Sequence, residues 1–200
     1  MSGAAFWDVR YAEPGFAYGD APNDFVRAVA HHIPDGPVLC LAEGEGRNAV
    51  FLAERGHRVR PVDLSQVGLD KAKRLATARG VEIEIEQADL ATYEIAEGQW
   101  AGVVAIWAHV PVAVRQHMLH AAIAGLRSGG ALVLEAYTPR QLGFRTGGPP
   151  DVALLVEPED LRRELAGVRI DLLEEIEREV HEGAYHRGPS AVVRALVFKP

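Results

Sequence analysis

The chain of 200 residues has a single cysteine, Cys40, so it cannot form an internal disulfide or the thiolate cluster of a structural zinc site. Long apolar runs are also missing, because polar residues interrupt each hydrophobic segment well before membrane-spanning length. Residues 1–6 have neither the basic start nor the apolar core of a signal peptide. We therefore expect no metal, no membrane partner and a cytoplasmic location.

Positive charge is in short supply, since 21 Lys and Arg residues stand against 28 Asp and Glu residues and leave a formal net charge of −7. No basic block stands out, so a surface that follows a phosphate backbone is not expected and nucleic acid is not predicted as a partner. A hydrophobic content of 48% suits one compact domain over residues 1–200, acting as a monomer or a homodimer.

Apolar segments alternate with helical patterns along most of the chain. The expected helices include 46–56, 65–79 and 111–127, and the expected strands are 37–42, 57–63, 82–87, 102–107, 131–137, 168–180 and 190–198. The last two strands have only a turn at 183–189 between them, which favours an antiparallel hairpin. The pattern predicts an α/β fold, with a doubly wound, mainly parallel seven-stranded sheet and a C-terminal antiparallel hairpin.

Two segments are expected to cover the ligand rather than to build the sheet. Residues 1–21 contain five aromatic side chains, too many for a disordered tail, and are predicted to be an irregular arm that folds over the cofactor. Residues 138–150 are rich in Gly and Pro and lie after a strand, which suits an active-site flap.

The most informative stretch is the segment 38–49, where an apolar strand is broken by Gly44 and Gly46 and followed at once by a helical pattern. Glycines permit a sharp turn and a close approach of the backbone to a ligand. The start of the following helix offers unpaired N–H groups. A strand, a glycine turn and a helix together predict a site for a nucleotide-like cofactor.

Two aspartates extend this site along the carboxyl edge of the predicted sheet. Asp63 ends the second strand, where its carboxylate can accept hydrogen bonds from the ribose hydroxyls of an adenosine group; the alternative is a cap for the helix that begins near Ser65. Asp89 ends the third strand and lies either beside an adenine edge or in a solvated turn.

The glycine turn also fits the G-x-G-x-x-A form of a nicotinamide-dinucleotide fingerprint. Glu43 and Glu45, however, put carboxylates where a pyrophosphate would dock, and like charges repel. A terminal antiparallel pair is also not expected of the plain dinucleotide fold. S-adenosylmethionine (SAM), with its cationic sulfonium and its ammonium group, suits an acidic turn better.

The chain resembles the class I SAM-dependent methyltransferases, and within them the small bacterial group related to tellurite-resistance and thiopurine methyltransferases. The segments that carry this resemblance span nearly the whole chain: 7–11 (WDVRY), 18–23 (YGDAPN), 38–49, 62–65 (VDLS), 88–90 (ADL), 109–111 (HVP) and 135–137 (EAY). The chain departs from the usual pattern at Cys40, where an acidic residue is common, and at Ala42, where Gly is common.

The resemblance implies a set of cofactor-binding residues. Trp7 and Arg10 would close over the methionine end, with Arg10 near the methionine carboxylate, and Leu64 and Leu90 would line the adenine pocket. Glu43 would replace the acidic group missing at position 40. The full predicted set is Trp7, Arg10, Ala42, Glu43, Gly44, Gly46, Asn48, Asp63, Leu64, Ala88, Asp89, Leu90 and Trp107.

The candidate catalytic residues are His109, His186 and Arg194. His109 follows the fourth strand, close to the expected methyl group, where it would be a base or a pocket wall; the alternative is a cap for the helix at Pro111. His186 and Arg187 in the hairpin turn, followed by Arg194 in the last strand, resemble a His-Arg then Arg arrangement that the tellurite group uses for anions, and Arg binds oxyanions well. Their alternatives are a solvated turn and an edge-strand charge. Further pocket candidates are Tyr18, Tyr137, Arg145 and Arg187.

By the resemblance, the reaction is an in-line displacement at the sulfonium methyl, which needs alignment and exclusion of water more than acid–base help. The acceptor is expected to be a small soluble nucleophile, such as a sulfur compound or a chalcogen oxyanion like tellurite. Two other functions stay open from the sequence: a nicotinamide-dependent oxidoreductase, and a SAM-binding module without turnover.

Overall fold

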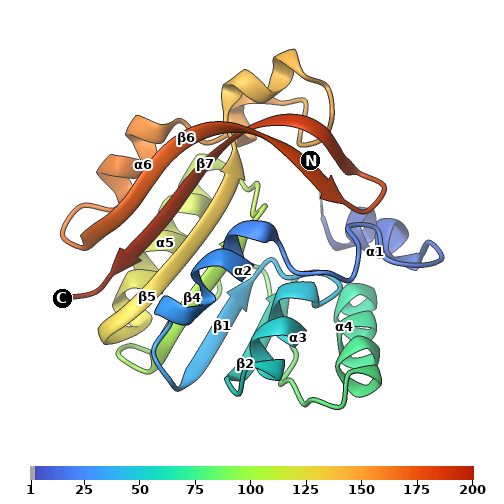
Figure 1. The fold of residues 1–200 in the computed structure, drawn as a ribbon, viewed down its shortest axis with the longest axis horizontal. Helices are drawn as coiled ribbons and strands as arrows, with labels where there is room; N and C mark the ends of the chain where they lie inside the picture. Colours follow the sequence, from blue (N-terminus) through green and yellow to red (C-terminus); the bar gives the residue numbers. More distant parts are fainter. Residues whose placement is uncertain (1–2) are drawn as a thin grey trace.

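The computed structural model describes residues 3–200, which form one seven-stranded sheet of order β3-β2-β1-β4-β5-β7-β6 (Figure 1). The strands are β1 (Pro37–Leu41), β2 (Arg58–Asp63), β3 (Glu86–Gln87), β4 (Trp100–Ile106), β5 (Leu126–Tyr137), β6 (Arg169–Glu182) and β7 (His186–Phe198). Strands β1 to β5 pair in parallel, whereas β7 pairs antiparallel with both β5 and β6. The predicted fold class is confirmed.

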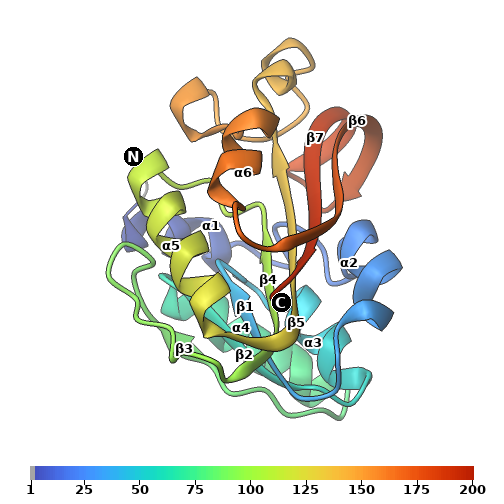
Figure 2. The same ribbon diagram turned by 90° about the vertical axis from the view of Figure 1, so that its left-hand side faces the viewer.

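Helices cover both faces of the sheet, as Figure 2 shows, with α2 and α3 on one side and α5 and α6 on the other. The helices are α1 (Ala4–Ala12), α2 (Asp24–Val29), α3 (Arg47–Glu54), α4 (Gln66–Ala78), α5 (Val112–Gly125) and α6 (Pro158–Glu164), with 3-10 turns η1 (Ala30–His32), η2 (Pro139–Gly143) and η3 (Val152–Leu154). Within the described residues 3–200, no helix is long and apolar enough to cross a membrane.

The core has two layers because successive strand residues point to opposite faces. In β1, Leu39 and Leu41 join the cluster that contains Leu119 of α5. Val38 and Cys40, both fully buried, join the cluster that contains Leu52 of α3. Cys40 therefore packs as a small apolar side chain in the interior and does not face the edge where a ligand binds.

Several predicted boundaries were wrong. The arm, predicted to be irregular, contains the helix α1, which packs against α4. Only Glu86 and Gln87 of the predicted strand 82–87 pair with β2. The predicted helix 111–127 ends at Gly125, and β5 begins at Leu126 instead of residue 131. The hairpin turn is shorter than predicted, because β7 begins at His186.

The arm and the hairpin turn meet at the carboxyl edge of the sheet, where Figure 1 shows the end of the hairpin next to α1. The Ala184 amide donates a hydrogen bond to the Ala17 carbonyl at 3.0 Å. The Tyr185 hydroxyl reaches the carboxylate of Glu13 at 2.7 Å. Segments separated by most of the chain thus close over the end of the sheet where α/β proteins bind ligands.

Candidate functional site

The glycine loop (42–46) connects β1 to α3 and has left-handed backbone at three positions, with φ of 52° at Ala42, 61° at Gly44 and 88° at Gly46. A Cβ at Gly44 would lie 2.5 Å from the Tyr11 hydroxyl, and one at Gly46 would lie 2.4 Å from the Cβ of Ala72. Protein neighbours, not only a ligand, therefore require glycine at both predicted positions. Ala42 is the one residue of this loop that bears the strain of a side chain at positive φ.

Glu43 caps the start of α3 from inside the loop. Its Oε1 atom accepts hydrogen bonds from the amides of Asn48 and Ala49, both at 2.8 Å. Burial raises the pKa of this carboxyl to about 7, although its hydrogen bonds and Arg47 act in the opposite direction. Two of the amide donors that an anion would use at this helix terminus are therefore already occupied.

Asn48 and Glu45 also bind within the protein. The Oδ1 atom of Asn48, a predicted cofactor residue, accepts a hydrogen bond from the Asn23 amide at 2.9 Å. Glu45 accepts one from the Ala17 amide at 2.7 Å and pairs with Lys71 at 2.8 Å. Asn48 and Glu45 thus tie Asn23 and the arm to the glycine loop.

Asp63 lies directly beside the glycine loop, as predicted from its place at the end of β2. Its Oδ2 atom accepts a hydrogen bond from the Gly44 amide and its Oδ1 atom one from the Ser65 amide, both at 2.8 Å. Burial raises the pKa of Asp63 to about 6. The cap of α4 is the Ser65 hydroxyl, which accepts from the Gly68 amide, so Asp63 does not take the alternative role of helix cap.

The residues predicted to surround the adenine differ in how far they are exposed. Leu64 and Ala88 are half-buried, and Leu90 is buried in the core cluster on the α5 side. Asp89 is exposed, and its Oδ1 atom accepts a hydrogen bond from the Ala91 amide at 2.9 Å. That contact stabilises a surface turn, which is the alternative role that the sequence left open for Asp89.

The side chains of Trp7 and Arg10 extend from α1 toward different neighbours. The Trp7 ring stacks on Tyr11 at 5.6 Å, beside the glycine loop. The Arg10 guanidinium lies 3.7 Å from the centre of the Tyr185 ring and donates to the Tyr18 hydroxyl at 3.1 Å. The arm therefore covers the cofactor side with Trp7 and the hairpin side with Arg10.

An aromatic cluster (Tyr18, Trp107, Tyr137, His186) lies where β4 and β5 end. Trp107 stacks on Tyr137 with ring centres 4.3 Å apart, and His186 meets both rings edge-on at 5.1 and 5.2 Å. His186 is 6% exposed, and its Nδ1 atom has no hydrogen-bond partner among the described residues. Burial lowers the pKa of His186 to about 3, so the imidazole is neutral.

His109 uses both ring nitrogens to hold backbone. Its Nδ1 atom lies 3.1 Å from the Leu154 carbonyl and its Nε2 atom 3.4 Å from the Tyr137 amide, so Nδ1 donates and Nε2 accepts. Burial lowers the pKa of His109 to about 4. This geometry does not support the predicted role of a base, since neither nitrogen is free; it connects η3 to β5.

Arg194 does not lie next to His186. The two residues are eight positions apart on β7, which is about 26 Å along an extended strand. The Nε atom of Arg194 pairs with Oε2 of the fully buried Glu135, and its guanidinium lies over the Phe25 ring at 5.1 Å. The predicted anion site built from His186 and Arg194 together is therefore not assembled.

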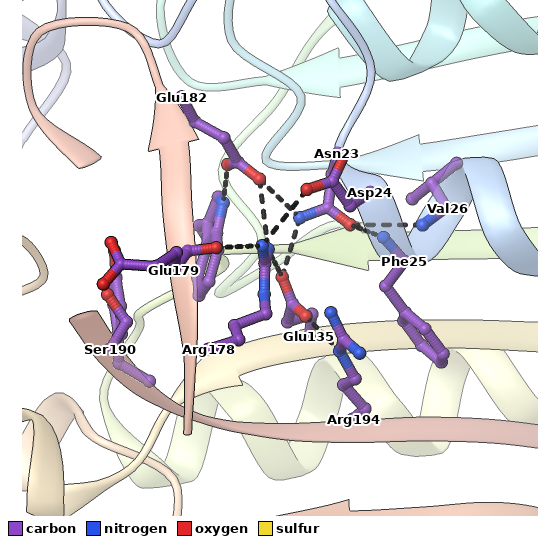
Figure 3. Close-up of polar contacts among 12 residues, drawn as sticks. Asn23, Asp24, Phe25, Val26, Glu135, Arg178, Glu179, Glu182, Ser190 and Arg194 are labelled. Atoms are coloured by element: carbon purple, nitrogen blue, oxygen red, sulfur yellow. Dashed lines mark hydrogen bonds and ion pairs between the residues drawn. The ribbon is translucent and has the colours of Figure 1, made fainter. Parts of the chain in front are cut away.

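Sequence reasoning missed a buried ionic network beneath the hairpin, drawn in Figure 3. Glu135 and Glu182 each accept hydrogen bonds from the Asn23 amide group, at 2.7 and 2.8 Å, and from Arg178, at 2.6 and 3.3 Å. A glutamate at position 135, inside an otherwise apolar strand, was the available signal, because a charge there needs buried partners.

Three comparisons place the chain among known proteins. Residues 38–130 match the family model of the methyltransferase domain. A tRNA 5-carboxymethoxyuridine methyltransferase of Escherichia coli K12 is 35% identical over 108 residues, which cover 52% of this chain and 41% of that protein.

Two solved structures share the fold. One comes from work on the conversion of a disulfide bond into a thioacetal group during echinomycin biosynthesis. Its TM-score is 0.77 and its sequence identity 19%, and the alignment covers 98% of this chain and 92% of that chain. TehB from Haemophilus influenzae has a TM-score of 0.73 and 17% identity over 98% of this chain and 67% of its own.

Residues 38–130 thus match a methyltransferase domain, and the described residues share the fold of these solved structures. The segment that the family model matches includes the glycine turn and Asp63, which carry part of the predicted resemblance to methyltransferases. The match spans 41% of the length of the curated relative, so the acceptor of this protein does not follow from it.

Proposed function

We propose that the protein transfers the methyl group of SAM to a small soluble nucleophile, such as a sulfur compound or a chalcogen oxyanion. The observation that carries the proposal is the Glu43 cap on α3. A pyrophosphate at this helix would find the Asn48 and Ala49 amides already occupied by the Glu43 side chain. A cationic cofactor without phosphate fits this loop, and a nicotinamide dinucleotide does not.

The residues around the glycine loop suit the parts of SAM. Each carboxylate oxygen of Asp63 accepts one backbone hydrogen bond and retains a second acceptor position for a ribose hydroxyl. Leu64 and Ala88, both half-buried, supply apolar surface for the adenine, and Trp7 and Arg10 extend from the arm that covers the site. When bound there, SAM supplies a methyl group already activated by its sulfonium.

His186 is our candidate for contact with the acceptor. It is neutral, buried among aromatic rings and has an unused Nδ1 atom, so it can accept a hydrogen bond from the acceptor or a bound water. Its low pKa makes it a weak base, which favours an acceptor that arrives as a thiolate or an oxyanion. Aromatic faces also contact polarisable sulfur favourably.

A small acceptor suits the cover over the site better than a polynucleotide does. The arm, η2 and the hairpin turn all lie over the carboxyl edge, and Gly147 packs against Tyr137 and His186. A net charge of −7 also disfavours a phosphate backbone. The curated relative is named for a tRNA substrate, so tRNA belongs among the acceptors to be tested.

The test is an acceptor screen that follows S-adenosylhomocysteine release with tellurite, selenite, small thiols, amines, phenols and bulk tRNA. Turnover with a thiol or an oxyanion supports the proposal, and turnover with tRNA alone refutes the small acceptor. Calorimetric binding of SAM without any product would identify a binding module, and binding of NADH in place of SAM would identify the oxidoreductase.

A further inference from the structure

Glu182, near the end of β6, gathers donors from three other parts of the fold through one buried carboxylate. Its Oε2 atom accepts hydrogen bonds from Trp107 Nε1 and from Arg47 Nη2, both at 2.6 Å. Its Oε1 atom accepts from Asn23 at 2.8 Å and from Arg178 at 3.3 Å, as Figure 3 shows. Glu182 is 5% exposed, so each contact forms away from water.

Trp107 is held in a costly backbone conformation. Its φ is 59°, in the left-handed region that side chains other than glycine seldom adopt, at a cost of about 1–3 kcal/mol. Its amide donates to the Glu135 carbonyl at 2.9 Å, which fixes the chain but not the ring. The ring has one polar atom, and that atom bonds to Glu182.

The position of the Trp107 ring matters because it lies between the cofactor side and the candidate acceptor side. It follows β4 at the carboxyl edge, stacks on Tyr137 and meets His186 edge-on. Arg47, the second donor to Oε2, begins α3 directly after the glycine loop. One oxygen atom of the hairpin therefore fixes both a ring of the site and the helix that follows the cofactor loop.

We propose that Glu182 is a positioning residue for methyl transfer, which holds the Trp107 ring in register with the glycine loop and thereby shapes the acceptor site. The inference rests on the proposed function. Glu182 contacts no substrate in this account and acts through Trp107. Glu135 belongs to the same network but its carboxylate does not contact the ring, so the two glutamates can be distinguished by their effect on Trp107.

The experiment compares Glu182→Gln with the matched control Glu135→Gln and combines Glu182→Gln with Trp107→Phe. Glu135 is buried in the same network and shares Asn23 and Arg178 with Glu182, but its carboxylate does not contact the ring. We measure kcat and KM for the acceptor, the dissociation constant and stoichiometry of SAM by calorimetry, and the tryptophan emission spectrum. The SAM stoichiometry corrects each rate for the folded fraction.

Glu182→Gln should lower kcat about tenfold while SAM affinity stays within about threefold, because the ring loses its alignment. Glu135→Gln should leave the corrected kcat within about twofold. The double variant should be no slower than the slower single variant, since both changes break one contact. Equal kcat losses in the two glutamine variants, or losses that multiply in the double variant, would overturn the proposal.

The emission spectrum tests the same contact without turnover. The part of the spectrum lost in Trp107→Phe belongs to Trp107, and it should shift in Glu182→Gln and not in Glu135→Gln. Identical spectra in all variants that contain Trp107 would also overturn the positioning role. Absence of product from the wild-type chain with any acceptor would refute the proposed function instead, so the two failures are distinct.

Discussion

Glu43 caps the helix that begins shortly after it, with its Oε1 atom 2.8 Å from the amide nitrogen of Asn48. The carboxylate is buried, and burial raises its pKa to about 7. The same contact thus has two consequences. It fills the anion-binding end of α3, and it makes the stability of the fold depend on pH near neutrality.

Glu43→Gln should remove part of this pH dependence while keeping the cap, because an amide oxygen can also accept from Asn48 and Ala49. Below pH 4.5 the carboxyl is protonated in both the native and the unfolded state. Between pH 4.5 and about 7 the native state retains the proton that the unfolded chain loses, so the free energy of unfolding falls as pH rises. At pH 8 the free energy of unfolding of the wild type is therefore about 3 kcal/mol lower than below pH 4.5, as far as Glu43 contributes.

Urea denaturation of both proteins from pH 4 to pH 8 measures this difference. The free energy of unfolding of Glu43→Gln, relative to the wild type, should rise across that window and level off above about pH 7. Every other ionisable group is present in both proteins, so its contribution cancels in the comparison. A difference that does not change with pH would contradict the buried, protonated carboxyl.

Ala42→Gly and Gly44→Ala should change stability in opposite directions. Ala42 has a φ of 52°, and glycine there relieves strain at some cost in unfolded-state entropy, for a net gain of about 0.5 kcal/mol. Alanine at position 44 would also have a positive φ, and its Cβ would lie 2.5 Å from the Tyr11 hydroxyl. The free energy of unfolding should therefore fall by about 2 kcal/mol. Thermal unfolding measures both; a loss for Ala42→Gly would mean that the loop does not adopt this conformation.

His186→Phe should separate stability from activity. The histidine is neutral in the native state but binds a proton below pH 6.5 when unfolded, so the free energy of unfolding decreases as pH falls from 6.5 toward 3. Phenylalanine fills a similar volume without an unpaired nitrogen, so the variant should be at least as stable at pH 7 and less sensitive to acid.

If His186 contacts the acceptor, the turnover of His186→Phe falls while its SAM affinity is retained. Unchanged turnover would show that His186 does not contact the acceptor.

Arg194→Ala should weaken the fold and leave the chemistry intact. Glu135 loses one of its three partners and remains buried, which costs about 2 kcal/mol. Turnover per folded molecule should stay within about twofold of the wild type. A loss of acceptor kcat/KM without a change in melting temperature would instead support the anion role that the sequence favoured for Arg194.

The parts of this molecule that follow local rules were predictable from the sequence. The alternation of apolar strands and helices predicted the mainly parallel seven-stranded sheet, and Asp63 lies beside the glycine loop because the carboxyl ends of parallel strands share one edge. The helix α1 was not predictable, since its Gly3 N-cap forms no side-chain bond and its stability comes from packing on α4. A strand of two residues such as β3 has no period to detect.

The buried network lay outside the reach of sequence reasoning for a different reason. Asn23 and Glu182 are 159 positions apart in the sequence. Arg178 is a charged residue in a strand of alternating pattern, which predicts a solvent-exposed side chain. These groups meet only in the folded chain, where Glu182 of β6 contacts Asn23 before α2 and Arg47 of α3. The sequence therefore identified a pair, His186 and Arg194, that the strand separates, and missed the contact between Glu182 and Trp107.

The central claim is that the glycine loop binds SAM and not a dinucleotide phosphate. The most direct measurement is isothermal titration calorimetry of the intact chain with SAM and with NADH, in the wild type and in Asp63→Ala. We expect one SAM site per chain, affinity weakened at least about tenfold by Asp63→Ala, and no heat of binding with NADH. Saturable NADH binding, or SAM affinity unchanged by the Asp63 substitution, would contradict the account.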